Sequence, residues 1–184
     1  MSDDENTPAD DAETDPAAPD DSAAAPAERY GAIPSEFLGD VVLHTDAAGY
    51  LESATAAKDD GFDQLVDLTA VDYLAYSAPR GLPLGVEAER FEVVTQLINH
   101  ESGERVRLRV QVSGDEPAVP SLFDLWPGSD ALEREVFDMF GIEFTDHPDM
   151  SRILMPEDWD GHPLRKDYAV GSIPVQFKAA SNIR

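Results

Sequence analysis

The chain has 184 residues, enough for one domain of ordinary size. Its 38 acidic and 13 basic side chains give a formal charge of −25, and such a field repels nucleic acid phosphates and anionic lipid headgroups. The absence of cysteine excludes disulfides, thiolate nucleophiles and cysteine-bound iron–sulfur clusters. No apolar run approaches the roughly 18 residues of a membrane span, and the acidic start is unlike a signal peptide, so we expect a cytoplasmic location and no nucleic acid partner.

The first 28 residues differ in composition from the rest of the chain. They are mainly Asp, Glu, Ala and Pro, with no aromatic or branched aliphatic side chain to bury. Such a segment cannot offset the entropy that ordering costs. We therefore predict a disordered acidic tail over residues 1–28, which is either a solubilising extension or a regulatory segment that mimics nucleic acid.

The folded body is expected to begin near Tyr30. Small and apolar residues at helical spacing predict a helix over 46–59, which Gly61 ends. The apolar and partly β-branched residues 65–76 predict a strand that runs into a loop. Residues 79–85 have turn composition.

A β-hairpin is predicted next, with strands over 91–98 and 104–112. The second strand alternates apolar residues with polar ones, so one face packs on a core and the other meets water or a partner. Its polar face carries three cations, Arg105, Arg107 and Arg109. These cations pair either with neighbouring carboxylates of this chain or with an acidic patch on a partner.

The clearest helical pattern covers residues 130–142. Asp130 is placed to cap the helix, Glu133 suits a reciprocal cap and the helix dipole, and Gly141 ends it. The apolar residues share one arc of the helix surface. They are Leu132, Val136, Met139 and Phe140, with Phe137 at the margin.

One acid of this helix lies within the apolar arc. Glu133 falls between Phe137 and Phe140, whereas Arg134 and Asp138 lie on the far side. An unpaired buried carboxylate is very costly. Glu133 is therefore held either by an arginine, internal or from a neighbour, or by water at the first turn.

Regular periodicity disappears after residue 145. Four prolines between 146 and 184 impose extended or turn geometry on the residues before them. An extended chain cannot bury apolar side chains against itself, so this arm must lie on its own domain or on another protein. Its larger apolar residues are Ile153, Leu154, Met155, Trp159, Leu164, Tyr168, Ile173, Val175 and Phe177.

The chain lacks the usual equipment for catalysis. It has no Gly-x-Ser-x-Gly motif, no glycine-rich phosphate loop and no dinucleotide fingerprint. His147 and His162 lie among acids, but both precede prolines and no predicted helix fixes them as metal ligands. Glu133 and Glu135 point about 200° apart on a helix and cannot converge on one substrate atom.

Several motifs together resemble the C subunit of the proton-translocating NADH:quinone oxidoreductase, respiratory complex I. The resemblance extends over about residues 36–178 and departs at Ser151, where the family often has a basic residue or proline, which weakens any ionic contact there. The motifs are EREVFDMF at 133–140, HPDMSRIL at 147–154, GHPLRKDY at 161–168, DLTAVDY at 67–73 and RFEVV at 90–94.

This resemblance implies an α/β (α+β) fold with helices packed on a mixed sheet. Together with the composition of the first residues and the loss of periodicity after 145, it divides the chain into the tail at 1–28, which lies outside the resemblance, a domain at 29–145 and an extended C-terminal arm at 146–184 that docks on neighbouring subunits. It implies no catalytic, cofactor or metal residue in this chain. The signature residues, which become candidate contacts to other subunits, are Glu133, Arg134, Glu135, Asp138, His147, Arg152, His162, Arg165, Lys166 and Asp167.

The resemblance also implies a structural role in the peripheral arm of the complex, against the D subunit, which forms the quinone site, and the B subunit, which bears a cluster. FMN, iron–sulfur clusters and quinone would sit on partner subunits, and the chain would meet the cytoplasmic face of the membrane only through the complex. Similar subunits serve deazaflavin- or ferredoxin-linked dehydrogenases and membrane hydrogenases. A free-standing acidic binding module and a metal-dependent hydrolase are the alternatives from other classes.

Overall fold

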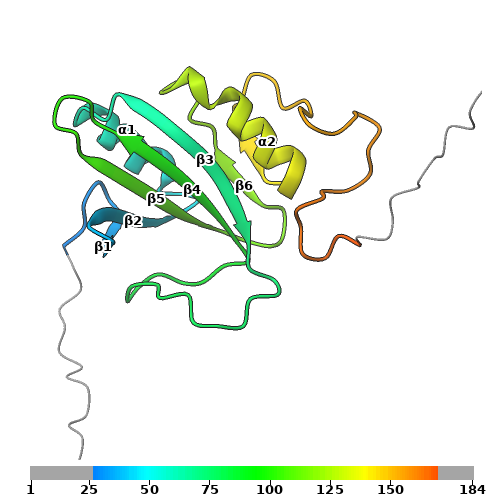
Figure 1. Cartoon of the computed structure of the whole chain (residues 1–184), viewed down its shortest axis with the longest axis horizontal. Helices are drawn as coiled ribbons and strands as arrows, with labels where there is room; N and C mark the ends of the chain where they lie inside the picture. The colour runs from blue at the N-terminus through cyan, green and yellow to red at the C-terminus, as the bar shows by residue number, and fades with distance from the viewer. Residues whose placement is uncertain (1–26, 170–184) are drawn as a thin grey trace, which may run out of the picture.

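A five-stranded mixed sheet forms the centre of the molecule (Figure 1). The computed structural model describes residues 27–169. The predicted α+β class with helices on a mixed sheet is confirmed. In spatial order the strands are β1 (Ile33–Phe37), β2 (Asp40–Asp46), β5 (Arg105–Val112), β4 (Phe91–Ile98) and β3 (Gln64–Asp72).

The strands pair antiparallel except at the centre, where β2 runs parallel to β5. Helix α1 (Tyr50–Asp59) follows β2, and helix α2 (Asp130–Phe140) comes after the sheet is complete. Both helices contribute to the single apolar core. The small residues Ala54 and Ala57 let α1 approach the sheet, and the Tyr50 hydroxyl lies 2.6 Å from the Thr95 hydroxyl of β4.

A second, two-stranded sheet positions α2. Strand β6 (Ala118–Pro120) pairs in parallel with β7 (Glu143–Thr145), and the short 3-10 helix η1 (Pro127–Ser129) leads into α2. Gly141 ends α2 in the left-handed conformation with φ +71°, a conformation that glycine adopts without the penalty of a Cβ.

The hairpin predicted over 91–98 and 104–112 is confirmed as β4 and β5. The helix predicted from 46 begins at Tyr50 instead, because Asp46 accepts the N–H of Gly49 in a tight turn. Likewise, β3 ends at Asp72, whose carboxylate accepts the N–H of Leu74. The β1–β2 hairpin and the β6–β7 pair were not predicted from the sequence.

Beyond β7 the chain leaves regular structure, as predicted, and residues 146–169 run beside α2 (Figure 1). The predicted acidic tail lies almost wholly outside the described residues, as does the arm after Ala169. Within residues 27–169, no helix has the length and apolarity to span a membrane.

Candidate functional site

One carboxylate of α2 makes several contacts to the arm. Oδ2 of Asp138 accepts the backbone N–H groups of three successive arm residues, Ile153, Leu154 and Met155, at 3.1, 2.7 and 2.8 Å. Its Oδ1 lies 2.5 Å from Nη1 of Arg152. Asp138 was expected on the far side of the helix from the apolar arc; the arm covers it and leaves it fully buried.

This arrangement sets the ionisation of Asp138. Burial on its own raises the pKa of the carboxyl, but the three N–H groups and the Arg152 guanidinium outweigh it and hold the pKa below its ordinary value. The carboxylate is therefore charged where the arm binds it. The same guanidinium donates to the carbonyl oxygen of Gly161 at 3.0 Å, which links two separate parts of the arm.

The C-terminal end of α2 receives the second signature motif. Leu164 donates its N–H to the carbonyl of Met139 at 3.0 Å, and Nδ1 of His162 lies 3.0 Å from the carbonyl oxygen of Asp138. Gly141 makes room for this contact, since a Cβ there would lie 2.6 Å from the His162 ring. Glycine at 141 thus serves both the helix end and the arm.

Arg134 joins the arm at a neighbouring point. It donates to the carbonyl oxygen of Ser151 at 3.1 Å and to the Ser151 hydroxyl at 2.9 Å. Position 151 therefore accepts hydrogen bonds from a cation without carrying a charge itself. The third residue of the motif, Glu135, lies exposed on α2.

Glu133 is fully buried, and no arginine of residues 27–169 binds it. Its carboxylate accepts the Ser121 hydroxyl at 2.6 Å and the backbone N–H of Leu122 at 2.8 Å. An arginine from residues 27–169 and bulk water at the first turn are both contradicted, because the segment after β6 folds over the start of α2, supplies these donors and buries the carboxylate. The predicted reciprocal cap is also absent, since no side chain caps the helix at Ser129.

His147 packs beside this carboxylate with its side chain wholly buried. Its Nδ1 accepts the N–H of Asp149 at 3.0 Å, so in the neutral ring Nε2 carries the hydrogen. Nε2 lies 3.4 Å from an oxygen of Asp130 and 4.0 Å from Glu133. His147 and His162 serve separate contacts, and no group of three or more potential metal ligands occurs within the described residues.

The arm binds the end of β3 at residues 165–167. Oδ2 of Asp72 accepts the N–H of Lys166 at 2.8 Å, and Arg90 bridges Asp72 and Asp167 at 2.9 Å each. Arg165 lies over the ring of Phe91, 3.6 Å from Asp167. The sequence did not single out Asp72 or Arg90, although both lie within its family motifs.

The contacts of the arginines on β5 bear on whether these cations pair within this chain or with a partner. Arg109 makes two hydrogen bonds to the buried Glu92, at 2.8 and 3.0 Å, and Arg80 from the loop after β3 binds the same carboxylate at 2.9 Å. Arg107 instead binds the side chain of Gln96. Pairing within this chain is therefore confirmed for Arg109.

The arm divides its apolar side chains between two sides. Met150 and Met155 pack on the core of the domain. Ile153, Leu154 and Leu164 point outward, with 40%, 58% and 48% of their surface exposed. Beside Lys166 a cavity of about 310 Å³ is lined by Tyr73 and Tyr76. Exposed apolar side chains on a fixed backbone are typical of a surface that another protein covers.

A domain that presents such a surface belongs to the class of assembly components. The model of the family described as "Respiratory-chain NADH dehydrogenase, 30 Kd subunit" matches residues 43–173, and the chain belongs to this family. The C subunit of the NADH-quinone oxidoreductase of Roseiflexus castenholzii is 45% identical over 146 residues, which are 78% of each chain. The corresponding subunit from Thermus thermophilus is 40% identical over 79% of this chain and 70% of its own.

Two solved structures are similar. One is titled "Nqo5 of the trypsin-resistant fragment (1-134)", with 36% identity, a TM-score of 0.55, and coverage of 62% of this chain and 85% of that one. The other belongs to a membrane-bound sulfane sulfur reductase, described as an archaeal respiratory membrane complex. At 22% identity and a TM-score of 0.62, over 83% of this chain and 90% of that one, it supports the fold alone.

Proposed function

We propose that this chain is a non-catalytic structural subunit in the peripheral arm of a proton-translocating NADH:quinone oxidoreductase. In such a complex electrons pass from NADH through FMN and iron–sulfur clusters to quinone, and proton translocation is coupled to this transfer. The chain holds the quinone-site D subunit and the cluster-bearing B subunit in place, at the cytoplasmic face of the membrane. Electron carriers sit on those partners, in keeping with a sequence that offers no cysteine for a cluster.

The main support for this proposal is the exposed apolar side chains of the arm, Leu154 and Leu164. The backbone of the arm is fixed by Asp138 at residues 153–155 and by Asp72 at Lys166. This double attachment holds Leu154 and Leu164 outward. Pre-organised apolar side chains bind a partner at a lower cost in conformational entropy than a flexible segment does.

The experiment replaces both leucines with serine and follows assembly in membranes. We expect the double variant to keep the unfolding midpoint of the isolated chain, because these side chains are exposed. Incorporation of the subunit and NADH:quinone activity should fall together, whereas NADH oxidation by an artificial acceptor should survive better. The matched control is Leu84→Ser, which removes a leucine that is 77% exposed on the loop after β3.

Affinity purification of the tagged chain from native membranes tests the identity of the complex. Co-purification of NADH- and flavin-binding subunits supports the proposal. Recovery with hydrogenase or deazaflavin-linked subunits instead would overturn the assignment to the NADH enzyme. Normal incorporation of the double leucine variant would show that the arm does not bind the partners.

A further inference from the structure

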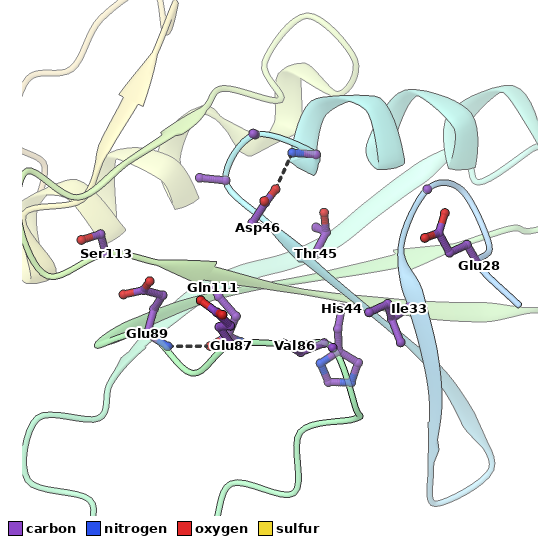
Figure 2. A pocket seen from close by; sticks show the side chains of 15 residues that line it. Glu28, Ile33, His44, Thr45, Asp46, Val86, Glu87, Glu89, Gln111 and Ser113 are labelled. Carbon is purple, nitrogen blue, oxygen red and sulfur yellow. Dashed lines mark hydrogen bonds between the residues drawn. The ribbon is translucent and has the colours of Figure 1, made fainter. Parts of the chain in front are cut away.

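A second, larger cavity lies at the carboxyl ends of the parallel strands β2 and β5. Its volume is about 630 Å³, within the range of ligand-binding pockets. The turn that precedes α1, the loop 85–89 and the segment before β1 form its walls (Figure 2). No part of the arm lines it.

The walls of this cavity are negatively charged. Figure 2 shows Glu28 on one side and Glu87 and Glu89 on the other, with Asp46 at the end of β2 between them. None of these four carboxylates forms an ion pair within residues 27–169, and no Lys or Arg of that part of the chain lines the cavity. Like charges that face one cavity repel, and a bound cation relieves the repulsion.

A buried histidine lies among these acids. His44 is 2% exposed, and its Nε2 lies 2.8 Å from the Ser35 hydroxyl, whereas its Nδ1 has no hydrogen-bond partner. Burial, with a smaller effect of Arg109, lowers the pKa of His44 to about 4, so the ring is neutral at pH 7. A buried polar atom without a partner is costly. In the tautomer whose Nε2 donates to Ser35, Nδ1 is an acceptor, and a donor arriving through the cavity would satisfy it.

Two cations near the cavity are already paired. Arg80 and Arg109 both bind Glu92, on the sheet face next to the cavity. Gln111 is also occupied, since its Oε1 accepts from Arg80 and its Nε2 donates to Glu92. Neither guanidinium is therefore available to the cavity acids.

We propose that this cavity binds an arginine side chain from a basic segment of a neighbouring polypeptide. The planar guanidinium carries five N–H donors and can satisfy His44 Nδ1 and a wall carboxylate together, whereas anions are repelled. Four carboxylates from three separate segments exceed the charge of one cation, so a chain with successive basic residues fits better than a free amine. The neighbour is another component of the complex, and in that respect the inference rests on the proposed function.

Binding is tested on the full-length chain by NMR titration with a capped Gly-Arg-Gly-Arg-Gly peptide at pH 7. We expect saturable binding that shifts the ring nitrogen signals of His44. Glu87→Gln with Glu89→Gln should weaken it at least fivefold. The control, Glu101→Gln with Asp115→Asn, removes two exposed acids outside the cavity and should change it less than twofold.

Three outcomes would overturn the inference. These are equal weakening by both double variants, equal binding of a Gly-Glu-Gly-Glu-Gly peptide, and free arginine that binds as tightly as the basic peptide. The last result would identify a small-molecule site. Because no complex is involved, a failed titration beside a successful arm experiment refutes the cavity inference and leaves the proposed function intact.

Discussion

Asp138 on α2 contacts Arg152 of the arm at 2.5 Å while it also accepts three backbone N–H groups. One side chain thus fixes both a charge and the backbone path of a segment without regular structure. The pair is largely shielded from water, with Asp138 at 0% and Arg152 at 14% side-chain exposure. The attachment of the arm should therefore depend strongly on this one carboxylate.

Asp138→Asn should release the arm, because it removes the charge that holds Arg152 and leaves a partly buried cation without a partner. We expect a loss of about 3 kcal/mol in the free energy of unfolding. Trypsin should also cut faster after Arg152 and Arg165. Denaturant unfolding and timed digestion followed by mass spectrometry measure the two effects.

Glu135→Gln is the control for this change, since it removes a charge from an exposed position of the same helix. It should leave both readouts near those of the natural chain. Equal digestion rates for the two variants would show that Asp138 does not hold the arm.

Acid should loosen the arm before it unfolds the sheet. The pKa values of Asp138 and Asp72 are both lowered from the ordinary 3.8, in each case because hydrogen bonds outweigh the effect of burial. A lowered pKa in the folded state gives stability that is present above pH 3.8 and is lost as the pH falls through the folded values. Hydrogen exchange at 153–155 and 166 should rise in that window, ahead of exchange in β4. Simultaneous loss of protection would contradict this order.

Gly141→Ala should destabilise the protein for two separable reasons. The left-handed conformation costs a residue with a Cβ about 1 kcal/mol, and the new Cβ meets His162 at 2.6 Å. Gly103→Ala offers a matched control, because φ is +74° there and a methyl group at that position would have nothing within 4 Å. Thermal unfolding should show a larger loss at 141. Equal losses would mean that His162 moves aside freely.

Glu133→Ala should remove about 2 kcal/mol from the free energy of unfolding, because the Ser121 hydroxyl and the Leu122 N–H both lose their buried acceptor. Glu135→Ala should cost only a few tenths, as expected for exposed surface. Chemical denaturation of both variants compares them directly. The interpretation fails if the two losses agree.

Elements with strong periodicity could be predicted from the sequence. The β4–β5 hairpin and α2 show clear periods of two and 3.6, and their boundaries agree with the structure to within a few residues. The hairpin of β1 and β2 was missed because its first strand is short, contains a proline and reverses through Leu38, at φ +54°. Leucine is unusual in such a turn.

The sequence predicted which residues form the site but not which groups each of them contacts. The motifs identified Asp138, Arg152 and His162, yet helix periodicity placed Asp138 on a far face without indicating that the arm would bury it. The partners of Glu133 are a hydroxyl and a backbone N–H from the segment before α2. Neither leaves a pattern in the sequence, because a backbone donor is present at almost every residue.

The parallel pairing of β2 with β5 has a consequence for the nascent chain. The β1–β2 hairpin has only β5 as a further neighbour in the sheet, and β5 ends at Val112. During synthesis the edge of β2 that pairs with β5 therefore stays unpaired until the ribosome has extruded the whole β3–β4–β5 meander. Pairings between distant segments slow folding, and an unpaired edge invites association with other chains. Between the emergence of residue 46 and that of residue 112, this unpaired edge is therefore most exposed to association with other chains.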